Sequence, residues 1–213
     1  NALDVQALID TAEGGHKEVE NILQRMREIA VQAANDTNSS QDRANLNEEM
    51  KALSTEIDRI AAATSWAGKN LMNEGSSQFS FQVGTSTNAE SAITISIGSM
   101  SATALSLDHT SITVTSSENS QFAISAIDQA ITSVNSQRSM LGATSNRLNY
   151  TVNNLTNVST NLVAALGRIQ DADYAAEITA LAKHQILQKA AIAMLAQANA
   201  SKSYVLTLLR SLN

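Results

Sequence analysis

Catalysis and metal binding both need titratable side chains that meet, and this sequence offers few candidates. The three histidines, His16, His109 and His184, are far apart in the chain and fall in different predicted elements. No His-x-x-x-His pair or acid-rich cluster accompanies them, so no metal site is predicted. Glu48 and Glu49 are adjacent, which on a helix turns their side chains about 100° apart instead of placing them on either side of a substrate.

Motifs and composition exclude several other functions. There is no Gly-x-Ser-x-Gly turn, no phosphate-binding loop and no cysteine, so the sequence predicts no nucleophilic, phosphate or thiol chemistry. A net charge of -6 argues against nucleic acid as a partner, because phosphate-binding surfaces need clustered Lys and Arg. No apolar run approaches the ~18 residues that a membrane span needs. We therefore expect no enzyme, no cofactor, no nucleic-acid partner and no membrane insertion.

The longest regular pattern in the chain lies between about residues 120 and 169. Apolar residues recur there in alternating steps of three and four, a repeat typical of a helix packed along a supercoiled seam. The positions are Ile124, Ile127, Ile131, Val134, Arg138, Leu141, Ser145, Leu148, Val152, Leu155, Ser159, Leu162, Leu166 and Ile169. At ~1.5 Å of rise per residue, this helix would reach roughly 70 Å, which predicts an elongated rod.

The same rhythm predicts two further helices near the N-terminus. The first covers about residues 1–34, and Gly14 with Gly15 marks either a kink or a close approach of another backbone. A polar turn follows, and Ser39 with Asp42 offers an N-terminal cap to a second helix over about 41–63. Two antiparallel helices that face one long helix, over about 120–168, predict a mainly α fold: a three-helix coiled-coil rod.

The middle of the chain changes period. Alternating apolar residues in Phe79–Val83 and Ile93–Ile97 predict a small antiparallel hairpin over about 78–98. Ile112 and Val114 form a weaker pair that suggests a third strand. The surrounding segment, about 99–119, is rich in Ser and Thr, and we interpret it as a surface loop.

An alanine-rich helix is predicted from Tyr174 to Arg210, after a break and a new N-cap at Asp171-Ala172-Asp173. Alanine favours helix but buries little apolar area, so this tail has no evident partner within the sequence. The chain opens at Asn1 without a methionine and already in helical register, which we interpret as a missing N-terminal segment. We expect the tail to become ordered only against that segment or against other subunits.

The outward face of the long helix is almost free of charge. Between Gln129 and Gly167 it carries only Arg138 and Arg147, and Ser, Thr, Asn and Gln fill its positions outside the seam. Such a face suits a close contact with another copy of the protein, because little charge must be desolvated. An ordinary neutral surface is the alternative interpretation.

Three blocks of the sequence resemble bacterial flagellin, the subunit of the flagellar filament. The first runs from Leu23 to Ala61, the second from Gln137 to Glu177, and the third comprises ILQKAAIAMLAQAN and VLTLLR. The resemblance implies a shaft domain at 1–170, with the loop at 99–119 in place of a variable outer domain. It also implies that 171–213 is the C-terminal half of the inner-core domain, lacking its N-terminal partner helix.

The resemblance further implies where the protein acts and with what. A flagellin is an extracellular homopolymer subunit that serves motility, and it reaches the outside through the flagellar type III export apparatus with a secretion chaperone. The helix that would bind the chaperone and neighbouring subunits carries Ile178, Leu181, Ile186, Leu187, Leu195, Val205, Leu208 and Leu209. The family's epitope for a Toll-like innate immune receptor corresponds to Gln24, Arg25, Ile29, Gln32 and Glu49.

Ile29 also falls on the apolar seam, so its exposure requires the seam to end nearby or to run along Ala30 instead. Two alternatives to a filament subunit stay open at this point. A hook-filament junction protein shares the terminal helices but caps the filament instead of extending it. A surface adhesin or ligand-binding protein derived from flagellin would use the Ser/Thr-rich loop.

Overall fold

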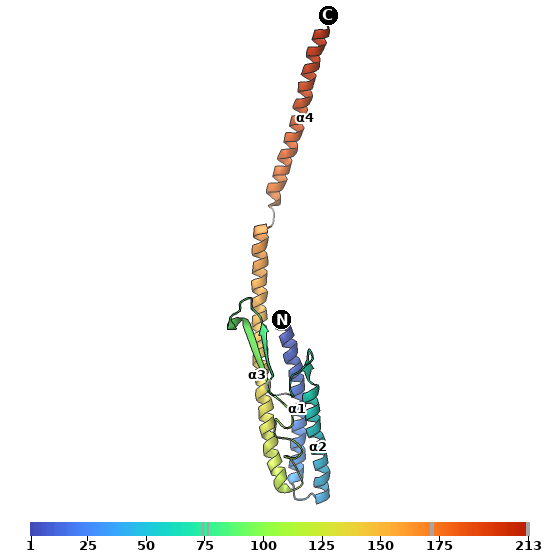
Figure 1. Cartoon of the computed structure of the whole chain (residues 1–213), viewed down its shortest axis with the longest axis vertical. Coiled ribbons are helices and arrows are strands. Elements are labelled where there is room, and N and C mark those ends of the chain that lie inside the picture. The colour runs from blue at the N-terminus through green and yellow to red at the C-terminus, as the bar shows by residue number, and fades with distance from the viewer. Residues whose placement is uncertain (74, 76, 171–172, 212–213) are drawn as a thin grey trace. The chain divides into compact units, whose positions relative to one another are not determined.

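The structure, a computed structural model, describes residues 1–73, 75, 77–170 and 173–211. Figure 1 shows that long helices make up most of the described chain, with small hairpins beside them. The elements are α1 (Ala2–Ala34), α2 (Ser40–Ala63), β1 (Ser65–Trp66), β2 (Lys69–Asn70), β3 (Ser77–Gln82), η1 (Ala89–Ser91), β4 (Ala92–Ile97), α3 (Ser117–Gln170) and α4 (Tyr174–Ser211). The expectation of a mainly α chain with a small antiparallel sheet is confirmed. The chain divides into two compact units, Asn1–Thr156 and Asn157–Asn213.

The first unit is built on α1, whose apolar residues lie on one face and are buried. Its buried residues are Val5, Leu8, Ile9, Ala12, His16, Val19, Leu23, Met26, Ile29, Ala30 and Ala33. This spacing of three and four residues places them on one stripe of a helix. The stripe packs into one apolar core with residues of α2, α3 and the hairpins.

A polar turn joins α1 to α2, and the predicted cap is present. The Ser39 side chain accepts a hydrogen bond from the Asp42 backbone N–H, and the Asp42 carboxylate accepts one from the Ser39 N–H. These two bonds satisfy backbone donors that a helix start leaves without partners. The predicted second helix therefore begins where the cap requires.

Side-chain pairs between the two helices, an ion pair and a hydrogen bond, show that α3 runs antiparallel to α1. Arg27 Nε lies 2.7 Å from Asp128 Oδ1 near one end, and Gln6 Nε2 donates to Asn149 Oδ1 near the other. Arg138, the charged residue on the predicted seam, forms ion pairs with Glu13 and Glu20 of α1. A charge on the seam is tolerated there because two carboxylates neutralise it.

The predicted seam of α3 is buried only as far as Leu148, so the expectation that all of it packs within this chain is wrong. Beyond that point Leu155, Leu162, Leu166 and Ile169 are exposed, with Ile169 exposed to 82%. Gln6, near the first residue of α1, pairs with Asn149, and the apolar residues of the α3 repeat from Leu155 onward are exposed.

The predicted hairpin at 78–98 is confirmed as β3 and β4, which pair antiparallel with Phe79 opposite Ile95 and Phe81 opposite Ile93. Ile93, Ile95 and Ile97 are buried in the shared core. A second hairpin, β1–β2, escaped sequence reasoning. Ala67 and Gly68, between its strands, both have positive φ, which matches the twist of a tight two-residue turn.

The segment between β4 and α3 is not the surface loop that its composition suggested, and it contains no third strand. Six of its apolar residues are buried: Met100, Ala102, Leu105, Leu107, Ile112 and Val114. Three polar side chains of α2 hold its backbone. Asn47 accepts from the Val114 N–H, Ser54 donates to the Leu107 carbonyl and Asp58 accepts from the Ala102 N–H. Irregular backbone can be buried here because these groups satisfy it.

The second unit consists of the last turns of α3, from Asn157, and the whole of α4. The predicted break lies partly outside the described residues, which exclude Asp171 and Ala172. The predicted cap is present at Asp173, whose carboxylate accepts from the Ala175 and Ala176 N–H groups. The predicted helix is observed from Tyr174 to Ser211. The boundary between the compact units, at Thr156, falls earlier in the chain than the domain boundary expected at residue 170.

Candidate functional surfaces

The predicted receptor epitope lies where α1 meets α2 and contains an ion pair between the two helices. Arg25 Nη2 is 2.7 Å from Glu49 Oε1, and its Nε donates to the same oxygen. Arg25 also bridges to Glu28 of its own helix. The hydrogen bonds to Glu49 raise the pKa of Arg25 above its ordinary value, so the guanidinium stays charged at any physiological pH.

The other epitope residues divide between the surface and the core. Gln24 and Gln32 are exposed, whereas Ile29 is only 1% exposed, and Ala30 is buried as well. Neither condition for an exposed Ile29 is therefore met. Ile29 lies beneath the surface formed by the polar residues.

Sequence reasoning missed an apolar residue on this surface. Val31 is about half exposed and lines a shallow groove with Gln24, Arg27, Glu28 and Gln32. Its signal was present in the sequence, because Val31 is a large apolar residue outside the seam of α1. The groove therefore has one exposed apolar side chain among polar ones.

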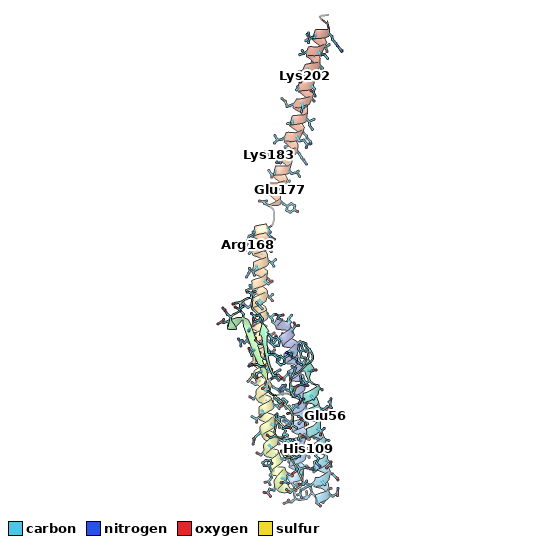
Figure 2. All side chains as sticks on the ribbon, in the orientation of Figure 1. Glu56, His109, Arg168, Glu177, Lys183 and Lys202 are labelled. Atoms are coloured by element: carbon cyan, nitrogen blue, oxygen red, sulfur yellow. The ribbon has the colours of Figure 1, made fainter. Side chains whose placement is uncertain are left out.

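The tail helix α4 exposes nearly all of its apolar side chains. Over Tyr174–Arg210 no residue is buried. All eight predicted tail residues are exposed: Ile178, Leu181, Ile186, Leu187, Leu195, Val205, Leu208 and Leu209. At about 100° per residue they lie on every side of the helix instead of on one stripe. Figure 2 shows that charged side chains also project from α4, among them Glu177, Lys183 and Lys202.

The end of α3 carries a second exposed apolar group. Its members are Leu155, Val158, Leu162, Val163, Leu166 and Ile169. From Leu148 to Gly167 the helix has no charged residue. The combination of exposed aliphatic side chains with amides and hydroxyls matches the core of a protein interface more closely than a solvated helix face.

An open groove of about 630 Å³ lies between the β3–β4 hairpin and α3. Glu90 and Ser91 line one wall, and Arg147, Tyr150 and Leu155 line the other. The Tyr150 side chain is 77% exposed. The lining includes one acid, Glu90, and one base, Arg147, on opposite walls.

The histidines lie in three different settings. His16 is buried in α1, His109 is on the surface after β4 (Figure 2), and His184 is exposed on α4. Glu48 is exposed and pairs with Lys51, whereas Glu49 pairs with Arg25. Within the described residues, no group of three or more His, Asp or Glu side chains could hold a metal ion.

None of the described helices combines the length and the apolar character that crossing a membrane requires.

The sequence matches two family patterns that together cover most of the chain. The bacterial flagellin N-terminal helical region matches residues 1–78, and the bacterial flagellin C-terminal helical region matches residues 124–209. These ranges include α1, α2 and most of α3 and α4. They leave out β4 and the buried segment that follows it.

Individual relatives extend the match over nearly the whole chain. The flagellin of Halalkalibacterium halodurans is 42% identical over 210 residues, which are 99% of this chain and 76% of that protein. Flagellin FlaB2 of Treponema pallidum is 37% identical over 224 residues, with 99% and 78% covered. The crystal structure of Bacillus cereus flagellin has a TM-score of 0.60 and 28% identity, covering 78% of this chain and 93% of that one.

Proposed function

The chain belongs to the bacterial flagellin family, and we infer from this that it is a structural subunit of the bacterial flagellar filament. Members of the family self-assemble into a homopolymer that lies outside the cell. The role is that of a structural protein instead of an enzyme. The support for a structural role comes from exposed surfaces that suit contact with other subunits, not from a catalytic site.

The observation that carries the proposal is the exposure of α4. A helix that is apolar on all sides is stable in water only when neighbours cover it on all sides. Its large aliphatic residues are each more than half exposed, Ile186 to 67%. Packing many copies side by side covers such a helix, and the exposed end of α3 offers further apolar surface for the same assembly.

Substitution of α4 in the natural flagellin gene tests the proposal. Leu181→Glu and Leu187→Glu place charges about 120° apart around the helix. We expect the double variant to abolish filaments, seen by electron microscopy, and swimming with them. Lys189→Glu is the control, because it changes charge at an exposed position without removing an apolar side chain. Filaments of normal length from the double variant would contradict the proposal.

We propose in addition that a flagellar secretion chaperone covers α4 before export through the flagellar export apparatus. The support is again the exposed apolar surface, which would aggregate in the cytoplasm without a cover. We expect the purified chaperone to protect backbone amides of residues 178–209 from hydrogen exchange and to leave α1 unchanged. Protection of α1 instead would place the chaperone elsewhere.

We further propose that the surface around Arg25 and Glu49 is recognised by a Toll-like innate immune receptor, as is typical of the family. The support is the exposed ion pair between Arg25 and Glu49 on adjacent helices, together with the exposed Gln24 and Gln32 on α1. Arg25→Ala should reduce receptor activation in a reporter cell line. Arg59→Ala is the matched control, since Arg59 forms a similar exposed pair with Glu56 on α2. Equal activation by both variants would contradict this epitope.

A further inference from the structure

His16 lies on the buried face of α1 with no exposed surface, where the packing of a helix does not itself require a histidine. Its Nδ1 is 2.6 Å from the carbonyl oxygen of Ala12. A carbonyl oxygen can only accept, so Nδ1 carries the proton and Nε2 is an unprotonated acceptor. That Nε2 is buried and has no hydrogen-bond partner among the described residues.

The charged groups around His16 come from two helices. Glu13 is on the same helix, one turn away, and Arg138 comes from α3. Arg138 Nη2 is 2.7 Å from Glu13 Oε1, and the other side of the guanidinium pairs with Glu20. One oxygen of Glu13, Oε2, is also buried without a partner among the described residues. On the side of the β1–β2 hairpin, the residues that contact neighbouring Gly15 are Thr64 and Met72, which are uncharged.

These surroundings disfavour the charged imidazolium. Burial is the main cause that lowers the pKa of His16 below its ordinary value of 6.5, and the positive charge of Arg138 lowers it further. The hydrogen bond to Ala12 and the charge of Glu13 act in the opposite direction without cancelling the effect of burial. Arg138 engages one oxygen of the Glu13 carboxylate, Oε1, and the other oxygen, Oε2, has no partner among the described residues.

We propose that His16 is a pH-responsive switch in the contact between α1 and α3. When Nε2 takes up a proton, a cation enters the dry face of α1 beside Arg138, and the packing of α1 against α3 loosens. The switch is a property of the folded first unit and does not depend on assembly. It would make this part of the subunit less stable in mildly acidic surroundings than at neutral pH.

The direction of the pH dependence follows from proton linkage. The pKa of His16 is lower in the folded chain than in the unfolded chain, so the unfolded chain binds the proton first as the pH falls. The stability that His16 contributes is therefore fully present above its unfolded pKa. It is lost as the pH falls from that value towards the folded pKa, and it changes no further below the folded pKa.

Equilibrium unfolding of the whole chain in urea tests the switch. Trp66 is the single tryptophan and packs partly buried against the core of the first unit, so its fluorescence reports unfolding there. Between pH 7.5 and pH 5, we expect the unfolding equilibrium constant to rise by about threefold or more. His16→Leu, which cannot titrate, should remove this rise. His109→Gln, at an exposed histidine, should keep it.

Nuclear magnetic resonance of the His16 imidazole in the unaltered chain tests the proposed switch even if His16→Leu fails to fold. We expect the ring of His16 to carry its proton on Nδ1 at neutral pH and to have a pKa below the ordinary histidine value of 6.5. We also expect faster amide exchange in α1 and in α3 around Arg138 at pH 5 than at pH 7.5. A His16 pKa at or above the ordinary value of 6.5, or an undiminished pH dependence in folded His16→Leu, would overturn the proposal.

Discussion

Helices α1 and α4 have similar lengths, 33 and 38 residues, but opposite surroundings. α1 gathers its apolar residues on one stripe and buries them within the chain. α4 spreads comparable residues around its whole circumference and buries none over Tyr174–Arg210. The arrangement of apolar residues on a helix therefore indicates where its partners lie. One stripe indicates neighbours within the subunit, and an apolar helix without a stripe indicates neighbours on all sides, which in this family are other subunits.

The largest effect is expected from removing apolar side chains at matched positions in the two helices. Leu23→Ala in α1 empties a fully buried site and should lower the free energy of unfolding by about 2–5 kcal/mol. Leu187→Ala in α4 should leave that free energy unchanged, because the side chain is more than half exposed. Urea unfolding followed by Trp66 fluorescence measures both. Equal losses would remove the distinction between the two helices.

A second comparison concerns two neighbouring glycines of α1. A Cβ added to Gly15 would lie 2.7 Å from the sulfur of Met72 and 2.9 Å from Oγ1 of Thr64, whereas a Cβ on Gly14 meets nothing within 4 Å. Gly15→Ala should therefore destabilise the first unit by about 1–3 kcal/mol through overpacking. Gly14→Ala should stabilise it by roughly 0.5–1 kcal/mol, because alanine favours helix. Thermal unfolding measures both variants. If Gly15→Ala is as stable as Gly14→Ala, the close packing at Gly15 is contradicted.

A smaller effect is expected from removing the N-terminal cap of a helix in the first unit and the N-terminal cap of α4. Ser39→Ala removes the cap of α2 and should cost about 1 kcal/mol of unfolding free energy. Asp173→Ala removes the cap of α4, where we expect a loss of helical circular dichroism without a change in the unfolding of the first unit. If Asp173→Ala destabilises the first unit as much as Ser39→Ala does, the stability of α4 is coupled to the core.

The smallest effect is expected at the exposed ion pair between α1 and α2. Glu49→Gln removes the charge that Arg25 binds, and exposed pairs of this kind contribute only about 0.2–1 kcal/mol. The unfolding free energy should therefore change little, and less at high salt than at low salt. A loss of several kcal/mol would show that this pair holds the two helices together, so that a change in receptor activation could no longer be assigned to a direct contact.

Much of the fold could be predicted because α1, α2 and the start of α3 bury regular apolar stripes, and the β3–β4 hairpin alternates strictly. Periodicity identifies the apolar face of a helix but not how far its partner extends. For that reason the exposure of Leu155 and Ile169 was not foreseen. Ile29 is the opposite case, because its place on the seam indicates the burial that is observed, whereas the family epitope indicates exposure.

The segment after β4 could not be interpreted from composition because its apolar residues follow no regular period. Its burial depends on Asn47, Ser54 and Asp58 of α2, which hold its backbone groups. These three residues lie seven and four positions apart, which places them on one face of α2, each directly after an apolar residue of the repeat. Polar residues at such spacing are the signal to look for. The β1–β2 turn was missed because Ala67 adopts a positive φ that its residue type does not predict.

Hydrogen exchange of the backbone amides of α4, compared between the dilute monomer and assembled filaments, tests the account most directly. We expect fast exchange at residues 178–209 in the monomer and strong protection of the same amides in the filament. The amides of α1 should be protected in both states, because their core is internal to the subunit. Equal exchange of α4 in the monomer and the filament would contradict the claim that other subunits cover this helix.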